Sequence, residues 1–258
     1  MNAVFTLSEL HIEQVSRHLG YRISDGRENV VAQVEQTEGD RPGWWARNFR
    51  NTTNNFSRDP SYGACTSAVT VQASGTDGTP LFAVRRGEVV PGRPEPVRQP
   101  PSQPPTREQL ADGIWWGQEI PSGCQVLDAG GTLLGHVVRQ VNRVMPMSPD
   151  EFRIGRTLLG GLMYRAVKTY RLHDGSGQVV GEAVSPELET QNTQGPGMLH
   201  LTGKGPYTIS DAGGRQVARL DGTEGGCVGE RAVLEFAGRL PDPLRTLVLA
   251  LPFAMKLV

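Results

Sequence analysis

The sequence lacks the motifs by which most enzymes and metal proteins are recognised. Its three cysteines form no CxxC pair, and its five histidines form no HExxH or other metal-ligand pair. No GxSxG, P-loop or Rossmann glycine motif occurs either. We therefore expect no zinc site, no disulfide framework, no cofactor, no catalytic residues and no enzymatic activity.

Excess charge and long hydrophobic runs are also absent. The 26 basic and 27 acidic residues give a formal net charge of -1, whereas nucleic-acid binders usually carry a basic excess. No stretch reaches the ~20 apolar residues that span a bilayer, and the N-terminus has no apolar signal-peptide core. Its TLSE segment, 6–9, has the form of a capping box and predicts a short helix. We expect a cytoplasmic protein with no transmembrane span and no nucleic-acid partner.

What the chain does contain is a repeated hairpin pattern. Each copy begins with alternating apolar residues, passes through an Asp/Gly-rich turn and ends in apolar residues, as expected for paired strands with one buried face. The copies are 21–34, 124–137, 170–183 and 207–220, with a weaker copy at 71–84. This repetition predicts an all-β domain.

One position of the repeated unit is an aspartate in the four stronger copies. These residues are Asp25, Asp128, Asp174 and Asp211. A calcium loop gathers several oxygen ligands within about a dozen residues, whereas each of these aspartates is followed mainly by glycine and small residues. We interpret them as turn residues rather than metal ligands.

The C-terminal segment, 242–258, differs from everything before it. Asp242 suits a helix N-cap and Pro243 suits the first turn, and the rest is apolar on all sides. About sixteen residues make a helix of roughly 24 Å, shorter than a hydrocarbon core of about 30 Å. We predict a helix buried inside a barrel, with Arg245 and Lys256 marking where it meets water.

Two irregular insertions interrupt the hairpins. In 41–63, the aromatic Trp44 and Trp45 alternate with Arg47 and Arg50, a mixture that suits stacking on a ligand as well as pinning the loop to the body. The segment 91–105 has seven prolines in fifteen residues and is expected to be an extended connection. It is either a loop within one domain spanning 1–258, which we favour, or a linker between two domains.

The Pro-rich segment also contains a possible partner motif. Arg98, Pro101 and Pro104 have the spacing of a polyproline ligand. Together with the Trp-rich insertion, they are the candidate contacts for a partner or ligand.

Hairpins of this form followed by PDPLRTLVLALPFAMKLV resemble the Tubby-like, LURP-one-related and phospholipid scramblase superfamily, above all its uncharacterised actinobacterial-type members. The resemblance implies a closed antiparallel barrel of about twelve strands around the hydrophobic C-terminal helix. Tubby proteins bind phosphoinositides through basic residues, but no motif here matches them. The cysteine-rich and calcium-binding segments of animal scramblases are missing too.

Two functions remain open. The first is a non-enzymatic barrel that binds lipid headgroups, a small ligand or a membrane surface. The second is a scaffold or interaction component of a protein assembly, which contacts its partners through the Trp-rich and Pro-rich insertions. The sequence gives no indication of the oligomeric state.

Overall fold

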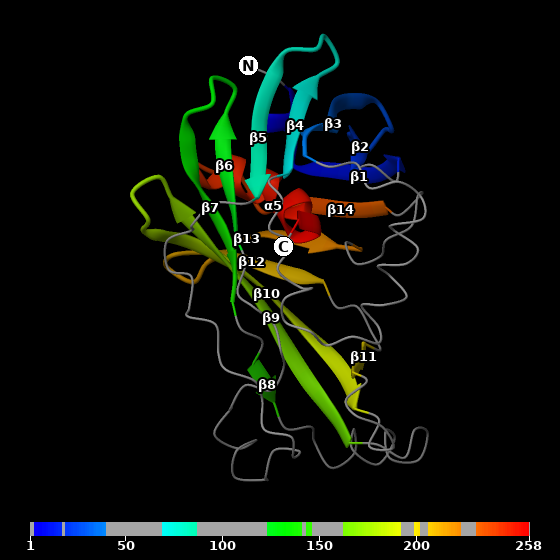
Figure 1. The fold of residues 1–258 in the computed structure, drawn as a ribbon, viewed down its shortest axis with the longest axis vertical. Helices are drawn as coiled ribbons and strands as arrows, with labels where there is room; N and C mark the ends of the chain where they lie inside the picture. The colour runs from blue at the N-terminus through cyan, green and yellow to red at the C-terminus, as the bar shows by residue number, and fades with distance from the viewer. Residues whose placement is uncertain are drawn as a thin grey trace.

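The protein is a closed antiparallel β-barrel around a buried C-terminal helix (Figure 1). The computed structural model describes residues 3–16, 19–39, 69–86, 123–140, 143–145, 162–191, 199–201, 206–222 and 231–257. Twelve strands form the ring, which closes where β9 pairs with β10. The barrel and central helix that the sequence predicted are therefore confirmed.

The strands follow one another around the barrel almost in chain order. They are β1 (Glu9–Ser16), β2 (Gly20–Ser24), β3 (Val30–Glu38), β4 (Val69–Gly75), β5 (Pro80–Arg86), β6 (Gly123–Asp128), β7 (Leu133–Arg139), β9 (Leu162–Asp174), β10 (Val179–Gln191), β12 (Tyr207–Asp211), β13 (Gln216–Asp221) and β14 (Arg231–Phe236). Two short strands, β8 (Arg143–Met145) and β11 (Leu199–Leu201), pair with β9 and β10 respectively. The described part of the chain also contains the short helix η1 (Ala3–Phe5) and the helix α5 (Leu244–Leu257).

Each predicted repeat is one hairpin of the barrel. The pairs are β2–β3, β4–β5, β6–β7, β9–β10 and β12–β13, while β1 and β14 pair with each other. The first residue of every repeat is buried. These residues are Tyr21, Val71, Cys124, Tyr170 and Tyr207. The alternation read from the sequence therefore places one face of each hairpin in the barrel core.

The aspartates stabilise the turns as predicted. In the β12–β13 hairpin, the Asp211 amide donates to the Arg215 carbonyl (2.9 Å), and Oδ1 of Asp211 accepts the amides of Gly213 and Arg215 (both 3.0 Å). The equivalent bonds recur at Asp25, Asp128 and Asp174. The backbone hydrogen bond from Arg215 lowers the pKa of the Asp211 carboxyl. The carboxylates of these four aspartates therefore accept hydrogen bonds from backbone amides of their own turns.

The helix α5 forms the centre of the core. All its side chains from Leu244 to Ala254 are buried. The ring of Phe253 lies edge-on to Tyr21 of β2 (centroids 5.2 Å apart) and 6.3 Å from Phe82 of β5. A helix that is apolar on all sides is stable here because strands surround it.

Arg245 corrects one prediction about this helix. Its side chain is only 4% exposed and does not meet water. The guanidinium lies 3.4 Å from the centroid of the Phe236 ring and donates to the carbonyls of Val4 (3.3 Å) and Leu7 (2.5 Å). The N-terminal segment packs against the start of α5, and Arg245 supplies the donor that its buried carbonyls require. Burial lowers the pKa of Arg245.

The predicted helix starting at Thr6 is also wrong. The hydroxyl of Thr6 instead donates to the carbonyl of Ala3, the first residue of η1 (2.9 Å). Glu9, the last residue of the capping-box pattern, begins β1 and pairs with Glu235 of β14. Strand pairing with β14 outweighs the local preference for a helix in this segment.

Candidate functional site

The two ends of the barrel are built differently (Figure 1). At one end, which we call the turn end, the five repeated hairpins turn within five residues: 25–29, 75–79, 128–132, 174–178 and 211–215. At the opposite end, the loop end, β3 and β5 finish, and the next described strands begin only at Val69 and Gly123. Long connections on a rigid scaffold are where binding residues concentrate. The loop end is therefore where a binding site is expected.

The inner wall becomes polar at the loop end. Gln14 and Gln36 are buried polar residues near the loop ends of β1 and β3, and the buried Ser185 lies at the middle of β10. Nε2 of Gln14 donates to the Ser16 carbonyl (3.1 Å), and Nε2 of Gln36 donates to the Glu38 carbonyl (3.2 Å). These amides satisfy backbone groups where the strands end.

Two arginines also reach this end of the barrel. Arg86 ends β5 and donates from Nη1 to the carbonyl of Leu257 in the last turn of α5 (2.6 Å). A cation at a helix C-terminus stabilises the helix dipole. Arg139 ends β7 opposite the buried Tyr170. The C-terminus of α5 and the cationic part of the inner wall thus lie at the loop end.

A pocket of about 350 Å³ opens at the loop end between β1, β2 and β3. We call it the β1–β3 pocket. Its size falls in the range of small-molecule sites, roughly 300 to 1,000 Å³. The exposed lining residues are Arg22, Gln33, Glu35 and Val15, and the buried ones are Tyr21, Val34 and Gln36.

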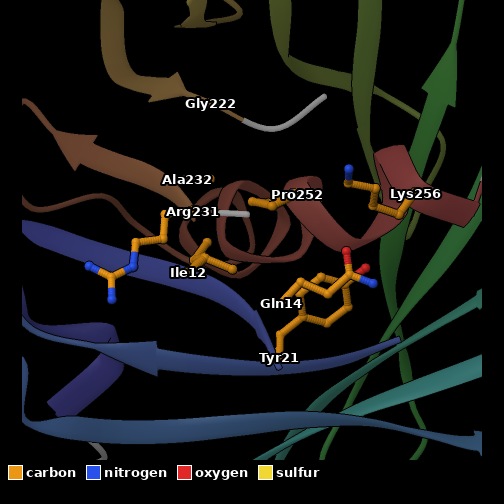
Figure 2. Close-up of a pocket in the computed structure, with 8 residues that line it drawn as sticks. All are labelled: Ile12, Gln14, Tyr21, Gly222, Arg231, Ala232, Pro252 and Lys256. Carbon is orange, nitrogen blue, oxygen red and sulfur yellow. The ribbon is translucent and has the colours of Figure 1, made fainter. Parts of the chain in front are cut away.

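Tyr21 separates this pocket from a smaller space beside the helix. Figure 2 shows that space, lined by Gln14 and Tyr21 from the wall and by Pro252 and Lys256 from α5. Its volume of about 20 Å³ has room for roughly one water molecule. The β1–β3 pocket is therefore the one of the two that could hold a ligand.

Charges of both signs line the β1–β3 pocket. Arg22 lies directly opposite Gln33 in the β2–β3 pairing, and Glu35 follows two residues later on the same exposed face. The guanidinium of Arg22 is 4.0 Å from Glu13, whose carboxylate also contacts Arg231 at 3.6 Å. Within the described residues, Glu35 makes no ion pair.

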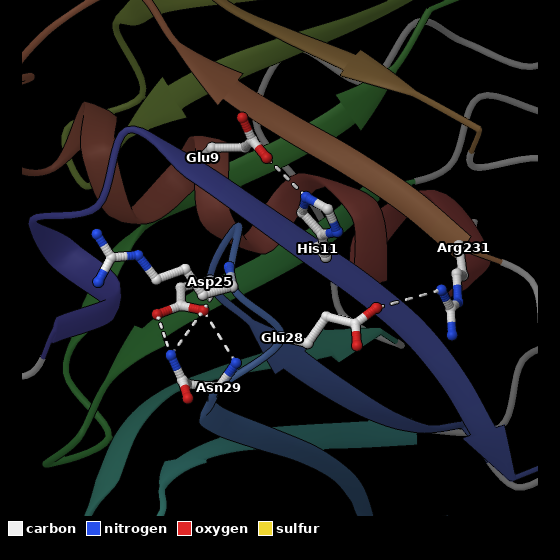
Figure 3. A network of polar contacts seen from close by, with 7 residues as sticks. Glu9, His11, Asp25, Glu28, Asn29 and Arg231 are labelled. Atoms are coloured by element: carbon white, nitrogen blue, oxygen red, sulfur yellow. Dashed lines mark hydrogen bonds and ion pairs between the residues drawn. The ribbon is translucent and has the colours of Figure 1, made fainter.

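The neighbouring outer surface carries other polar contacts (Figure 3). Nε2 of His11 lies 2.7 Å from Oε1 of Glu9, and Glu28 lies 4.0 Å from Arg231. Glu28 and Arg231 are largely exposed and Glu9 and His11 are partly exposed, and such surface pairs contribute only about 0 to 1 kcal/mol. We assign them to the solvated surface.

The sequence-predicted contact residues lie outside the described residues. They are Trp44, Trp45, Arg47, Arg50, Arg98, Pro101 and Pro104. The sequence did not indicate Arg22 or Glu35 as binding residues, because Arg22 is an ordinary polar position of the repeat 21–34 and Glu35 follows that repeat. Only the strand register, which brings residues thirteen apart onto one exposed face, reveals them.

Other chemistry is not supported by the described part of the chain. It contains no group of three or more His, Cys, Asp or Glu side chains that could hold a metal ion. Cys124 is fully buried, and its burial raises the pKa of the thiol to about 12, so it is a poor nucleophile. Among the described helices, none has both the length and the apolar character needed to span a bilayer.

Comparison of the chain with protein-family models, curated proteins and solved structures found no match. The resemblance to the Tubby-like superfamily therefore stays a prediction. The barrel and buried helix that it implied are present.

Proposed function

We propose that the protein is a non-enzymatic binding barrel that takes a small polar ligand or a lipid headgroup at its loop end. The observation that carries the proposal is the β1–β3 pocket, about 350 Å³ in volume, at the end where the inner wall becomes polar. The opposite end offers short, self-satisfied turns instead. The Tubby-like resemblance, itself a proposal, agrees with a binding role.

A matched pair of valines allows a direct test. Val15 lines the pocket at the loop end, whereas Val179 follows a tight turn at the other end, and both side chains are 42% exposed. Val15→Trp should fill the pocket without disturbing the core, and Val179→Trp should leave the pocket open. We expect the first variant to lose flotation with phosphatidylcholine or phosphatidylglycerol vesicles, and the second to keep it.

Two results of these experiments would count against the proposal or against the pocket. Wild-type protein that floats with neither kind of vesicle, and shows no thermal shift with soluble headgroup compounds, would contradict the proposal. Equal behaviour of the two tryptophan variants would place binding away from the pocket.

A second candidate function is a scaffold that contacts protein partners. It is favoured by the strands that flank the Trp-rich and Pro-rich insertions in the sequence: β3 and β5 end, and β4 and β6 begin, at the loop end. Deleting 92–104 should leave the barrel folded and remove a partner in pull-down experiments. An unchanged set of partners would exclude this role for the Pro-rich segment.

A further inference from the structure

Building on the proposed function, we infer that the β1–β3 pocket takes a zwitterionic ligand. Arg22 binds the anionic group of that ligand, and Glu35 binds its cationic group. The ligand class follows from where the two charges stand, what already pairs with them and what surrounds them.

The strand register sets the spacing between the two charges. Arg22 pairs with Gln33, and Glu35 stands one step further along β3 on the same face. Diagonal neighbours of this kind are about 7 to 8 Å apart at their Cα atoms. This separation leaves room for a small dipolar group to lie between the two residues and contact both side chains.

Both charges are available for a ligand. Glu35 is exposed and forms no ion pair with the described residues. Among the described residues, Arg22 forms an ion pair with Glu13 at 4.0 Å, which is the longest distance at which an ion pair is counted. The carboxylate of Glu13 lies closer to Arg231, at 3.6 Å. Exposed pairs of this length are weak, so a ligand anion can compete for Arg22.

The two opposite charges in the pocket exclude a ligand that carries charge of only one sign. A simple anion that approached Arg22 would also face Glu35, and a simple cation bound to Glu35 would face Arg22. The chain as a whole has a net charge of -1, which gives no general attraction to an anionic surface. A ligand with one charge of each sign satisfies both side chains at once.

The remaining lining suits the carbon skeleton of such a ligand. Val15, 42% exposed, offers an apolar contact at the pocket edge, whereas Tyr21 and Val34 alternate with the charged residues and turn their side chains into the barrel core. Two sources offer this chemistry: the headgroup of a zwitterionic lipid and a free zwitterionic metabolite.

Calorimetric titration with glycerophosphocholine, glycerol phosphate and choline tests the inference. The first compound carries both charges, and the other two carry one each. We expect measurable binding of glycerophosphocholine and binding at least about tenfold weaker for either fragment, since one charge-assisted contact is worth about 1.4 kcal/mol or more. Flotation with phosphatidylcholine vesicles then separates the sources: binding of vesicles identifies a lipid, and binding of the soluble compound alone identifies a free ligand.

Charge-removing variants assign the two roles. Arg22→Gln and Glu35→Gln should each weaken glycerophosphocholine binding by about tenfold. Arg219→Gln on β13 and Glu235→Gln on β14 remove equivalent exposed charges elsewhere and should bind like the wild type.

The outcomes separate this inference from the proposed function. Tight binding of glycerol phosphate that Glu35→Gln leaves unchanged would overturn the zwitterionic assignment and keep ligand binding at the loop end. The same conclusion follows if Val15→Trp blocks vesicle binding but neither charge variant affects it. If the protein binds none of the three compounds and neither phosphatidylcholine nor phosphatidylglycerol vesicles, both the zwitterionic assignment and the proposed function are overturned.

Discussion

Glu28 stands at a turn position where the four other repeated hairpins have glycine. Its φ is 65°, and the corresponding glycines have φ from 79° to 86°. The left-handed region costs a residue with a side chain roughly 1 to 2 kcal/mol, whereas glycine adopts it freely but loses more entropy on folding. Glu28→Gly should therefore raise the free energy of unfolding by about 0.5 to 1 kcal/mol. Gly214→Ala should lower it by about 1 kcal/mol, and an added Cβ at Gly214 would meet no heavy atom within 4 Å, so the cost is conformational.

Urea unfolding followed by circular dichroism measures both changes. Glu28→Gln is the control, because it keeps the side chain at positive φ and removes only the exposed contact with Arg231, which is 4.0 Å long and worth little. If Glu28→Gly is less stable than Glu28→Gln, or if Gly214→Ala is as stable as the wild type, the account of these turns is refuted.

Three further predictions concern stability and reactivity. Arg245→Met keeps much of the side-chain volume but removes the guanidinium that donates to the carbonyls of Val4 and Leu7 and stacks on Phe236, so it should lower the free energy of unfolding by about 2 to 4 kcal/mol in urea. Hydrogen bonds lower the pKa of the Asp211 carboxyl below its ordinary value of 3.8, so its contribution to stability should be complete above about pH 4 and lost as the pH falls through the folded pKa. Asp211→Asn should therefore flatten the fall in the urea midpoint between pH 4 and pH 2, and an equally steep fall would contradict this. With the other two cysteines replaced by serine, Cys124 should resist iodoacetamide at pH 8 until urea unfolds the protein.

The sequence predicted the features that depend on local chemistry. An aspartate followed by glycines can close a turn with its own neighbours, so the hairpins were recognisable without any tertiary information. The apolar C-terminal helix was recognisable because its length and hydrophobicity required burial. The assignment of Arg245 to the surface failed because its partners, the carbonyls of Val4 and Leu7, are more than two hundred residues away in the chain.

The pocket could not be predicted for a related reason. The β2–β3 pairing shifts its register between Ile23 and Ser24, and this bulge decides that Arg22 lies opposite Gln33. Slipping a strand by one residue would move Glu35 to the other face of the sheet. The Trp-rich and Pro-rich contacts stay predictions, since they lie outside the described residues.

An environment-sensitive fluorophore on each end of the barrel tests the central claim that the loop end binds the ligand. Val15→Cys and Val179→Cys provide attachment points of equal exposure at the loop end and the turn end, in a background without Cys65 and Cys227. Addition of glycerophosphocholine or phosphatidylcholine vesicles should change the emission of the label at position 15 and leave that at position 179 unchanged. A change at position 179 alone, equal changes at both, or no change at either would contradict the account.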